Sequence, residues 1–140
     1  MTITRLHIEY DYSFYLLGVS CHLKDYRFCW AINHFLSMDL SRQEDHVLNT
    51  GEMMGAFAYF RSSEDPQRSM PVFSLVSNRS AAGSLIPEAR EYDFFLMADN
   101  LRGERERRTF LRAVQGIRGV LAVTPLDPMA LKSRQNLIIA

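Results

Sequence analysis

Neither sign of charge dominates this sequence, in which 16 Lys and Arg side chains are balanced by 16 Asp and Glu side chains. A formal net charge of zero excludes a nucleic-acid binder that works through bulk positive charge, and it also excludes a dominant acidic tail. Hydrophobic residues make up 47% and charged residues 23% of the 140 residues. These values are ordinary for a globular domain, so wholesale disorder and fibrous architectures are excluded as well.

Long apolar runs are missing too. Every apolar stretch is broken by a charged residue before it reaches the ~18 residues of a membrane-spanning helix. The first residues, MTITRLHIE, lack the basic start and the unbroken apolar core of a secretory signal. We therefore expect a soluble, cytoplasmic protein with no membrane partner.

Cysteine is scarce, with only Cys21 and Cys29 in the chain. On one helix, this spacing would separate the two residues by ~12 Å of rise, beyond the ~7 Å limit between the Cα atoms of a disulfide. The close cysteine pairs of a zinc site are also lacking, and His22 and His34 nearby do not supply them. We expect two reduced, buried thiols and no bound metal.

Motifs for catalysis and for cofactor binding are not found. The sequence contains no Gly-x-Ser-x-Gly elbow, no Gly-x-Gly-x-x-Gly fingerprint and no P-loop, and its four histidines are scattered. We therefore predict no cofactor and no catalytic residue, and we favour a protein that is not an enzyme.

Helical periodicity is present in two segments, residues 23–36 and residues 104–116. The apolar stripe of the first comprises Phe28, Cys29, Ile32, Phe35 and Leu36, and that of the second comprises Phe110, Ala113, Val114 and Ile117. Gly116 and Gly119 predict the end of the second helix.

Strand patterns occupy most of the remaining chain. Alternating apolar residues predict a first strand from Leu6 through Phe14 that continues to Val19, with Gly18 at a bulge or an end. Residues 41–51 look like a polar connection, and residues 85–88 look extended because a proline follows Ile86. Further strands are predicted at 53–60, 70–77, 92–98, 120–124 and 137–139.

The order of these elements predicts the fold class. The loop SSEDPQRS favours an antiparallel pair of the strands at 53–60 and 70–77, and the strand at 92–98 is apolar on both faces, as expected for a central strand. We predict a single α+β domain over residues 1–140, a two-layer sandwich whose mostly antiparallel sheet carries both helices on one face.

Three stretches resemble a known family. Residues 85–96, LIPEAREYDFFL, resemble the motif that names the IPExxxVDY family of uncharacterised bacterial proteins, with Tyr92 in place of the Val and Phe94 in place of the Tyr. The segments LKDYR to AIN at 23–33 and TPLDP through LKS to NLI at 124–138 are similar to the same family. This resemblance implies a family but no activity, cofactor or catalytic residue.

Several polar residues lie within these otherwise apolar motifs: Asp25, Arg27, Glu88, Asp93, Lys132 and Asn136. A carboxylate inside a strand is costly unless it is paired. We therefore interpret these residues as a structural network in which carboxylates pair with Arg27 and Lys132 or satisfy buried amides. The alternative is a functional pocket, with an enzyme built on Glu88 and Asp93.

Tyr26 and Trp30 form an apolar pair beside the stripe of the first helix, which is therefore apolar over more than half of its circumference. Such a helix either packs between two layers or contributes to an interface. The function that we favour is a non-catalytic module that binds a protein partner or a second copy of the chain.

Arginines gather on the polar face of the second helix, where Arg105, Arg108 and Arg112 follow helical spacing. Guanidinium groups bind phosphates, so an RNA-associated accessory protein is the alternative function. Glu104 is placed to pair with Arg108, however, and a solvated face of mixed charge is the interpretation that we prefer.

Overall fold

The fold is described by a computed structural model that covers residues 10–49, 54–65, 67 and 70–139. One antiparallel sheet contains six strands in the order β10-β1-β9-β6-β5-β2. These strands are β1 (Tyr15–Cys21), β2 (Ser41–Arg42), β5 (Tyr59–Arg61), β6 (Val72–Ser77), β9 (Phe94–Asp99) and β10 (Val120–Leu126). The sheet and its two helices confirm the predicted α+β class.

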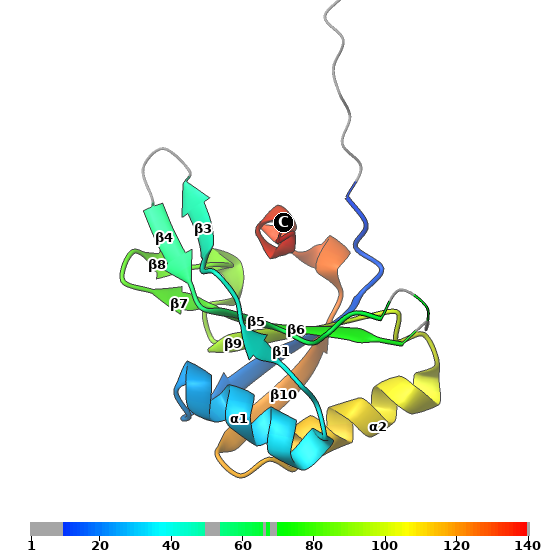
Figure 1. The fold of residues 1–140 in the computed structure, drawn as a ribbon. Helices are drawn as coiled ribbons and strands as arrows, with labels where there is room; N and C mark the ends of the chain where they lie inside the picture. Colours follow the sequence, from blue (N-terminus) through cyan, green and yellow to red (C-terminus); the bar gives the residue numbers. More distant parts are fainter. Residues whose placement is uncertain (1–9, 50–53, 66, 68–69, 140) are drawn as a thin grey trace, which may run out of the picture.

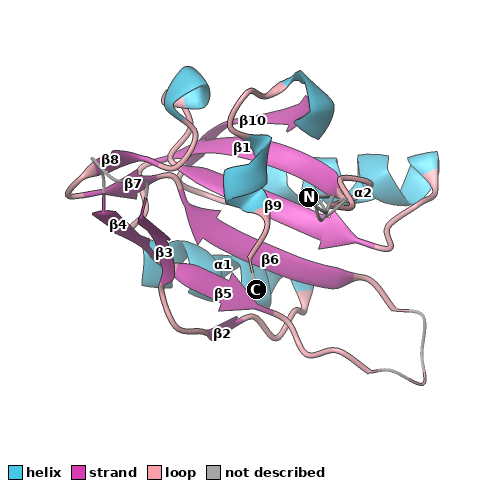
Figure 2. Cartoon of the chain, turned by 90° about the horizontal axis from the view of Figure 1, so that it is seen from above, coloured by secondary structure: helices cyan, strands magenta, loops and turns pink. Residues whose placement is uncertain are grey.

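The two helices, α1 (Asp25–Leu36) and α2 (Glu104–Gln115), lie on one face of the sheet (Figure 1). Short elements cover the opposite face of the sheet, and Figure 2 shows these elements in front of the sheet. They are the hairpins β3 (His46–Asn49) with β4 (Met54–Phe57) and β7 (Arg79–Ser80) with β8 (Gly83–Ser84), and the 3-10 helices η1 (Pro87–Ala89), η2 (Pro128–Ala130) and η3 (Arg134–Leu137).

The sheet therefore separates two hydrophobic cores. Leu17 and Val19 of β1 join α1 and α2 in the first core, whereas Leu16 joins the hairpins and the C-terminal segment in the second. Strand β9 lies between β1 and β6 and contributes to both cores. The apolar run from Phe94 to Ala98 is what burial on both faces requires, and the predicted central position is confirmed.

Gly18 lies in the middle of β1. A glycine is needed there because the ring of Tyr92 packs directly over this position. A Cβ atom at this position would come within 2.8 Å of the ring. The irregularity in β1 instead falls between Ser20 and Cys21, so the prediction of a bulge or an end at Gly18 is wrong.

The alternating segment before β1 is not a strand where it is described. Residues 10–14 are irregular, and residues 6–9 lie outside the described residues. Tyr12 contacts the rings of Tyr10 and Phe14, with 6.4 Å between ring centroids in each pair. The guanidinium of Arg134 lies 5.7 Å from the ring centroid of Tyr12. These aromatic side chains pack against each other and the C-terminal segment without pairing into the sheet.

Other boundaries differ because tertiary contacts outweigh the local pattern. The strand predicted at 53–60 is divided between β4 and β5, which belong to different sheets, and Met53 is outside the described residues. The connection predicted at 41–51 contains β2 and β3. Ile86 is extended as predicted, but Pro87 begins η1.

Two C-terminal predictions also need correction. Strand β10 continues through Pro125 to Leu126, because an edge strand tolerates a residue without an amide hydrogen. The strand predicted at 137–139 is absent from the described chain; η3 ends at Leu137, which is buried in the second core.

Candidate interaction surface on the helix layer

Helix α1 exposes three large aromatic side chains. Tyr26, Trp30 and Phe35 are 62%, 60% and 61% exposed, and we refer to them as the α1 aromatic surface. The same helix buries Phe28, Cys29, Ala31 and Ile32 in the first core. Phe35 was predicted to lie on the buried stripe, and its exposure corrects that prediction.

His34 orders the rings of this surface. The imidazole stacks on the indole of Trp30, with 4.9 Å between centroids and 8° between planes, and it meets the ring of Phe35 edge-on at 4.9 Å. Side chains that are already held in one arrangement lose less rotamer entropy when a ligand binds. The contacts therefore favour binding by the exposed part of Trp30.

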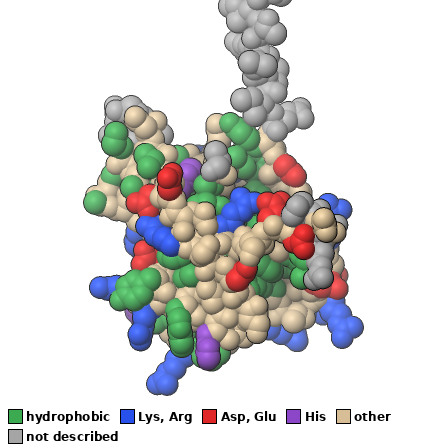
Figure 3. Space-filling model, in the orientation of Figure 1, with side chains coloured by type: hydrophobic (Ala, Val, Ile, Leu, Met, Phe, Trp, Pro, Cys, Tyr) green, Lys and Arg blue, Asp and Glu red, His purple; other side chains and the backbone are tan. Residues whose placement is uncertain are grey.

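A groove runs between α1 and the turn that follows α2, with a volume of about 860 Å³. Its lining comprises Leu23, Tyr26, Arg27, Trp30, Ala31, Phe35, Arg118 and Gly119, and we call it the α1 groove. Figure 3 shows exposed hydrophobic side chains beside Lys and Arg side chains over the helix layer, at the lower edge of the view.

Gly119 fixes one wall of the α1 groove. Its φ of +100° is a backbone conformation that L side chains rarely adopt, and a Cβ atom here would lie 2.9 Å from Leu23. The amide of His22 also donates a hydrogen bond of 3.2 Å to the carbonyl of Gly119. The turn after α2 is thus packed directly against the segment that leads into α1.

The predicted arginine stripe of α2 (Arg105, Arg108 and Arg112) is exposed, but its members do not share one hollow. A second hollow, between α1 and α2, is lined by Phe35, Leu36, Met38, Arg105, Glu106, Thr109, Phe110 and Ala113. Arg105 thus lies near the α1 aromatic surface, whereas Arg108 and Arg112 line neither of these hollows. Within the described part of the chain, the proposed ion pair between Glu104 and Arg108 is not formed.

The apolar stripe of α2 is buried as predicted, with one exception. Phe110, Val114 and Ile117 are buried, whereas Ala113 is exposed beside the second hollow.

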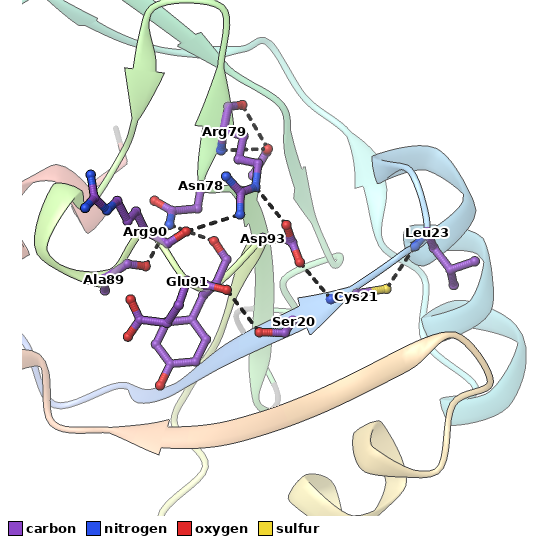
Figure 4. Close-up of polar contacts among 11 residues, drawn as sticks. Ser20, Cys21, Leu23, Asn78, Arg79, Ala89, Arg90, Glu91 and Asp93 are labelled. Carbon is purple, nitrogen blue, oxygen red and sulfur yellow. Dashed lines mark hydrogen bonds and ion pairs between the residues drawn. The ribbon is translucent and has the colours of Figure 1, made fainter.

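The polar residues of the sequence motifs fall into separate groups. Asp93 precedes β9, and its two carboxylate oxygens accept hydrogen bonds from the amide of Cys21 at 2.8 Å and from Nε of Arg79 at 2.7 Å (Figure 4). Its ionic partner is thus Arg79, and neither Arg27 nor Lys132 forms the expected ion pair among the described residues.

Glu88 and Asn136 connect η1 to the C-terminal segment. The carboxylate of Glu88 accepts a hydrogen bond of 2.8 Å from the amide of Ser133, and the amide group of Asn136 donates one of 2.9 Å to the carbonyl of Leu85. Desolvation by burial would raise the pKa of Glu88, but hydrogen bonds from its own backbone, Ser133 and Lys132 outweigh it and lower the pKa.

Asp25 acts locally, because its Oδ1 accepts from the amide of Tyr26 at 2.7 Å. The carboxylates of Glu88 and Asp93 contact backbone amides, and neither lines a hollow of the helix layer.

Asn78, a residue that the sequence did not single out, lies beside these contacts in Figure 4. It is fully buried, and its side chain donates to the carbonyls of Ala89 and Tyr92 at 3.0 and 2.8 Å and accepts from the amide of Ile86 at 2.9 Å. An asparagine just after a strand is typical of a turn, so the sequence carried no signal for burial.

Both cysteines are free and buried, as predicted, although Cys21 lies in β1 and not on the helix of Cys29. Burial raises the pKa of both thiols. No group of three potential metal ligands occurs among the residues that the structure describes. The described helices include none with the length and apolar character needed to cross a membrane.

No protein-family model matches the chain, and no curated protein or solved structure is similar to it. The resemblance to the IPExxxVDY family therefore stays a prediction.

Proposed function

We propose that this protein is a non-catalytic interaction module that binds a protein partner, or a second copy of the chain, through the α1 aromatic surface. The observation that carries the proposal is the exposure of three large aromatic side chains on one helix, beside a groove. Exposed apolar patches of this kind mark interaction sites, and Trp, Tyr and Arg are the residue types most enriched at binding hot spots.

The other exposed apolar residues support this choice of surface. The other large apolar residues that are more than half exposed are Val47, Met54, Met70, Leu121 and Met129. Val47 and Met54 share the two-stranded sheet of β3 and β4, whereas Met70, Leu121 and Met129 belong to three different segments. Single apolar residues on a surface are ordinary and need no partner. The α1 aromatic surface differs because three such residues share one short helix.

The test compares two substitutions at similarly exposed positions. Trp30→Ser removes the centre of the α1 aromatic surface, and Met129→Ser, on η2, is the control. Tagged forms of both variants and of the wild-type chain are purified from the native cell, and copurifying proteins are quantified. Sedimentation velocity of each purified chain measures self-association.

We expect one partner, or a dimer, that the wild-type chain and Met129→Ser share and that Trp30→Ser loses. A hot-spot tryptophan contributes at least about 2 kcal/mol, so the affinity should fall by roughly thirtyfold. A wild-type chain that remains monomeric at high concentration and has no partner sensitive to Trp30→Ser contradicts the proposal.

RNA association is the second candidate, and the observation that favours it is the exposure of Arg105, Arg108 and Arg112 without ion pairs to the carboxylates of α2 in the described chain. Binding through these side chains would weaken steeply with salt. The triple alanine variant should then lose affinity for a single-stranded RNA, and equal binding by the variant and the parent excludes this function.

A further inference from the structure

We infer that the α1 groove binds a segment of another protein that is both apolar and acidic, an inference that rests on the function proposed above. The charged side chains that line the groove are Arg27 and Arg118, and its lining contains no carboxylate. Both arginines are exposed, and neither has an ion-pair partner among the described residues. Lys24, also exposed, adds a third positive charge at the start of α1.

The apolar part of the α1 groove requires that the ligand also carry apolar side chains. Leu23 is half-buried and Ala31 is buried, so a ligand in the groove meets hydrocarbon below and aromatic rings at the side. The volume of about 860 Å³ is sufficient for more than one side chain. Large apolar residues of the partner would fill this space, while Asp or Glu residues beside them would reach Arg27 and Arg118.

The groove is shaped before a ligand binds. The contact of Gly119 with Leu23 holds the turn after α2, and the stack with His34 holds the indole of Trp30. A preformed site loses less entropy on binding than one that must be ordered. It therefore suits a partner segment that itself becomes ordered in the groove.

A second copy of the chain fits this surface poorly. In a symmetric dimer, the same patch faces itself, so Arg27, Arg118 and Lys24 of one copy would approach their equivalents in the other. Like charges in contact are unfavourable, and the groove has no acidic lining residue to compensate. The positive charge of the groove thus favours a different protein that brings the negative charge.

Single-stranded RNA also combines negative charge with groups that stack on aromatic rings. One face of the Trp30 indole is already occupied by His34, however, and only two cations line the groove in a chain of zero net charge. An RNA strand is held by a longer positively charged track. The geometry thus favours the acidic protein segment over RNA.

The experiment selects ligands from a library of random peptides displayed on phage, with the full-length chain as bait. We expect the enriched peptides to combine large apolar residues with several Asp or Glu residues. One enriched peptide is then synthesised with a fluorescent label, and its affinity for the variants is measured by anisotropy. A labelled oligouridylate serves as the RNA probe.

The charge variants give the sharpest readout, because both positions are exposed and tolerate substitution. The double variant R27E/R118E should bind the peptide at least about tenfold more weakly, since two attractive contacts become repulsive. The same variant should enrich basic peptides when the selection is repeated. Arg90 is also exposed but follows η1 on the opposite layer, so R90E should bind like the wild-type chain.

The outcomes separate this inference from the proposed function. If the enriched peptides carry no acidic excess yet lose binding with Trp30→Ser, the acidic partner is wrong and the proposed function stands. If no peptide is enriched, or if peptide binding is unchanged by Trp30→Ser, the acidic partner segment is wrong, whereas the proposed function fails only if the copurification and sedimentation experiments also show no partner and no dimer that depend on Trp30. Oligouridylate binding that Trp30→Ser abolishes overturns the acidic protein segment in favour of RNA.

Discussion

Replacing Asn78 by alanine should destabilise the fold by more than the loss of one hydrogen bond would. Three hydrogen bonds would be lost, and their partners are backbone groups of residues 86–92. The carbonyl of Ala89 would retain a second bond, from the amide of Tyr92 at 3.3 Å. The amide of Ile86 and the carbonyl of Tyr92 would be left without a replacement.

The magnitude follows from this count. Each of the two groups left without a partner costs ~1–3 kcal/mol, and the third lost bond adds ~1 kcal/mol, so we expect a loss of about 3–7 kcal/mol in the free energy of unfolding. A domain of this size is stable by only ~5–15 kcal/mol. With a urea dependence of about 2 kcal/mol per molar, the urea midpoint should fall by roughly 1.5–3.5 M.

The assay is urea unfolding followed by circular dichroism of the helices, because Trp30 is too exposed to report burial of the core. Asn33→Ala is the matched control. The Asn33 side chain also forms two hydrogen bonds to a backbone, those of 2.9 and 2.8 Å to Leu40, but it is only half-buried. Water can replace its contacts, so we expect a loss of about 1 kcal/mol.

A third variant separates lost hydrogen bonds from lost volume. Asn78→Asp keeps the size and the acceptor for the amide of Ile86, but it turns an oxygen toward the carbonyls of Ala89 and Tyr92. It should be at least as unstable as Asn78→Ala at neutral pH. The reasoning is refuted if Asn78→Ala costs no more than Asn33→Ala, or if Asn78→Asp is as stable as the wild-type chain.

Two further predictions concern the turn after α2 and the thiols. Gly119→Ala should cost about 1–3 kcal/mol, because it combines an unfavourable φ with a clash against Leu23, whereas Gly116→Ala, with no Cβ contact under 3.5 Å, should be nearly neutral in the same urea assay. Since burial raises the pKa of Cys21 and Cys29, both should react with Ellman's reagent at least about tenfold more slowly in the native chain than in urea; fast native reaction would contradict their burial.

The sequence was sufficient for the elements whose burial matches one local period. Helix α1 was predicted because its buried residues recur at helical spacing, and β9 was predicted as central because it is apolar on both faces. The segment at residues 10–14 shows the limit of this reasoning. Its alternation matches a strand, but Tyr12 packs against Arg134, more than a hundred positions away, and no local pattern encodes that contact.

The candidate surface could be predicted only in part, for a related reason. Tyr26 and Trp30 stand apart from the buried stripe in sequence, so an exposed pair was foreseeable. Phe35 occupies a position that helical spacing assigns to the core, but it lies in the last turn of α1, where it lines both hollows of the helix layer and is exposed. The opposite wall of the groove comes from Arg118 and Gly119, which only the packing of the turn against Leu23 brings into place.

Asp93 is connected to the α1 groove through Cys21 and Leu23. Asp93 accepts from the amide of Cys21, just after the irregularity in β1, and the sulfur of Cys21 accepts from the amide of Leu23 at 3.3 Å. Leu23 in turn forms part of the α1 groove and packs against Gly119. The carboxylate of Asp93 thus helps to set the path of the chain into α1, and with it one wall of the α1 groove. A polar residue that lies outside a groove can shape its wall in this way without lining it.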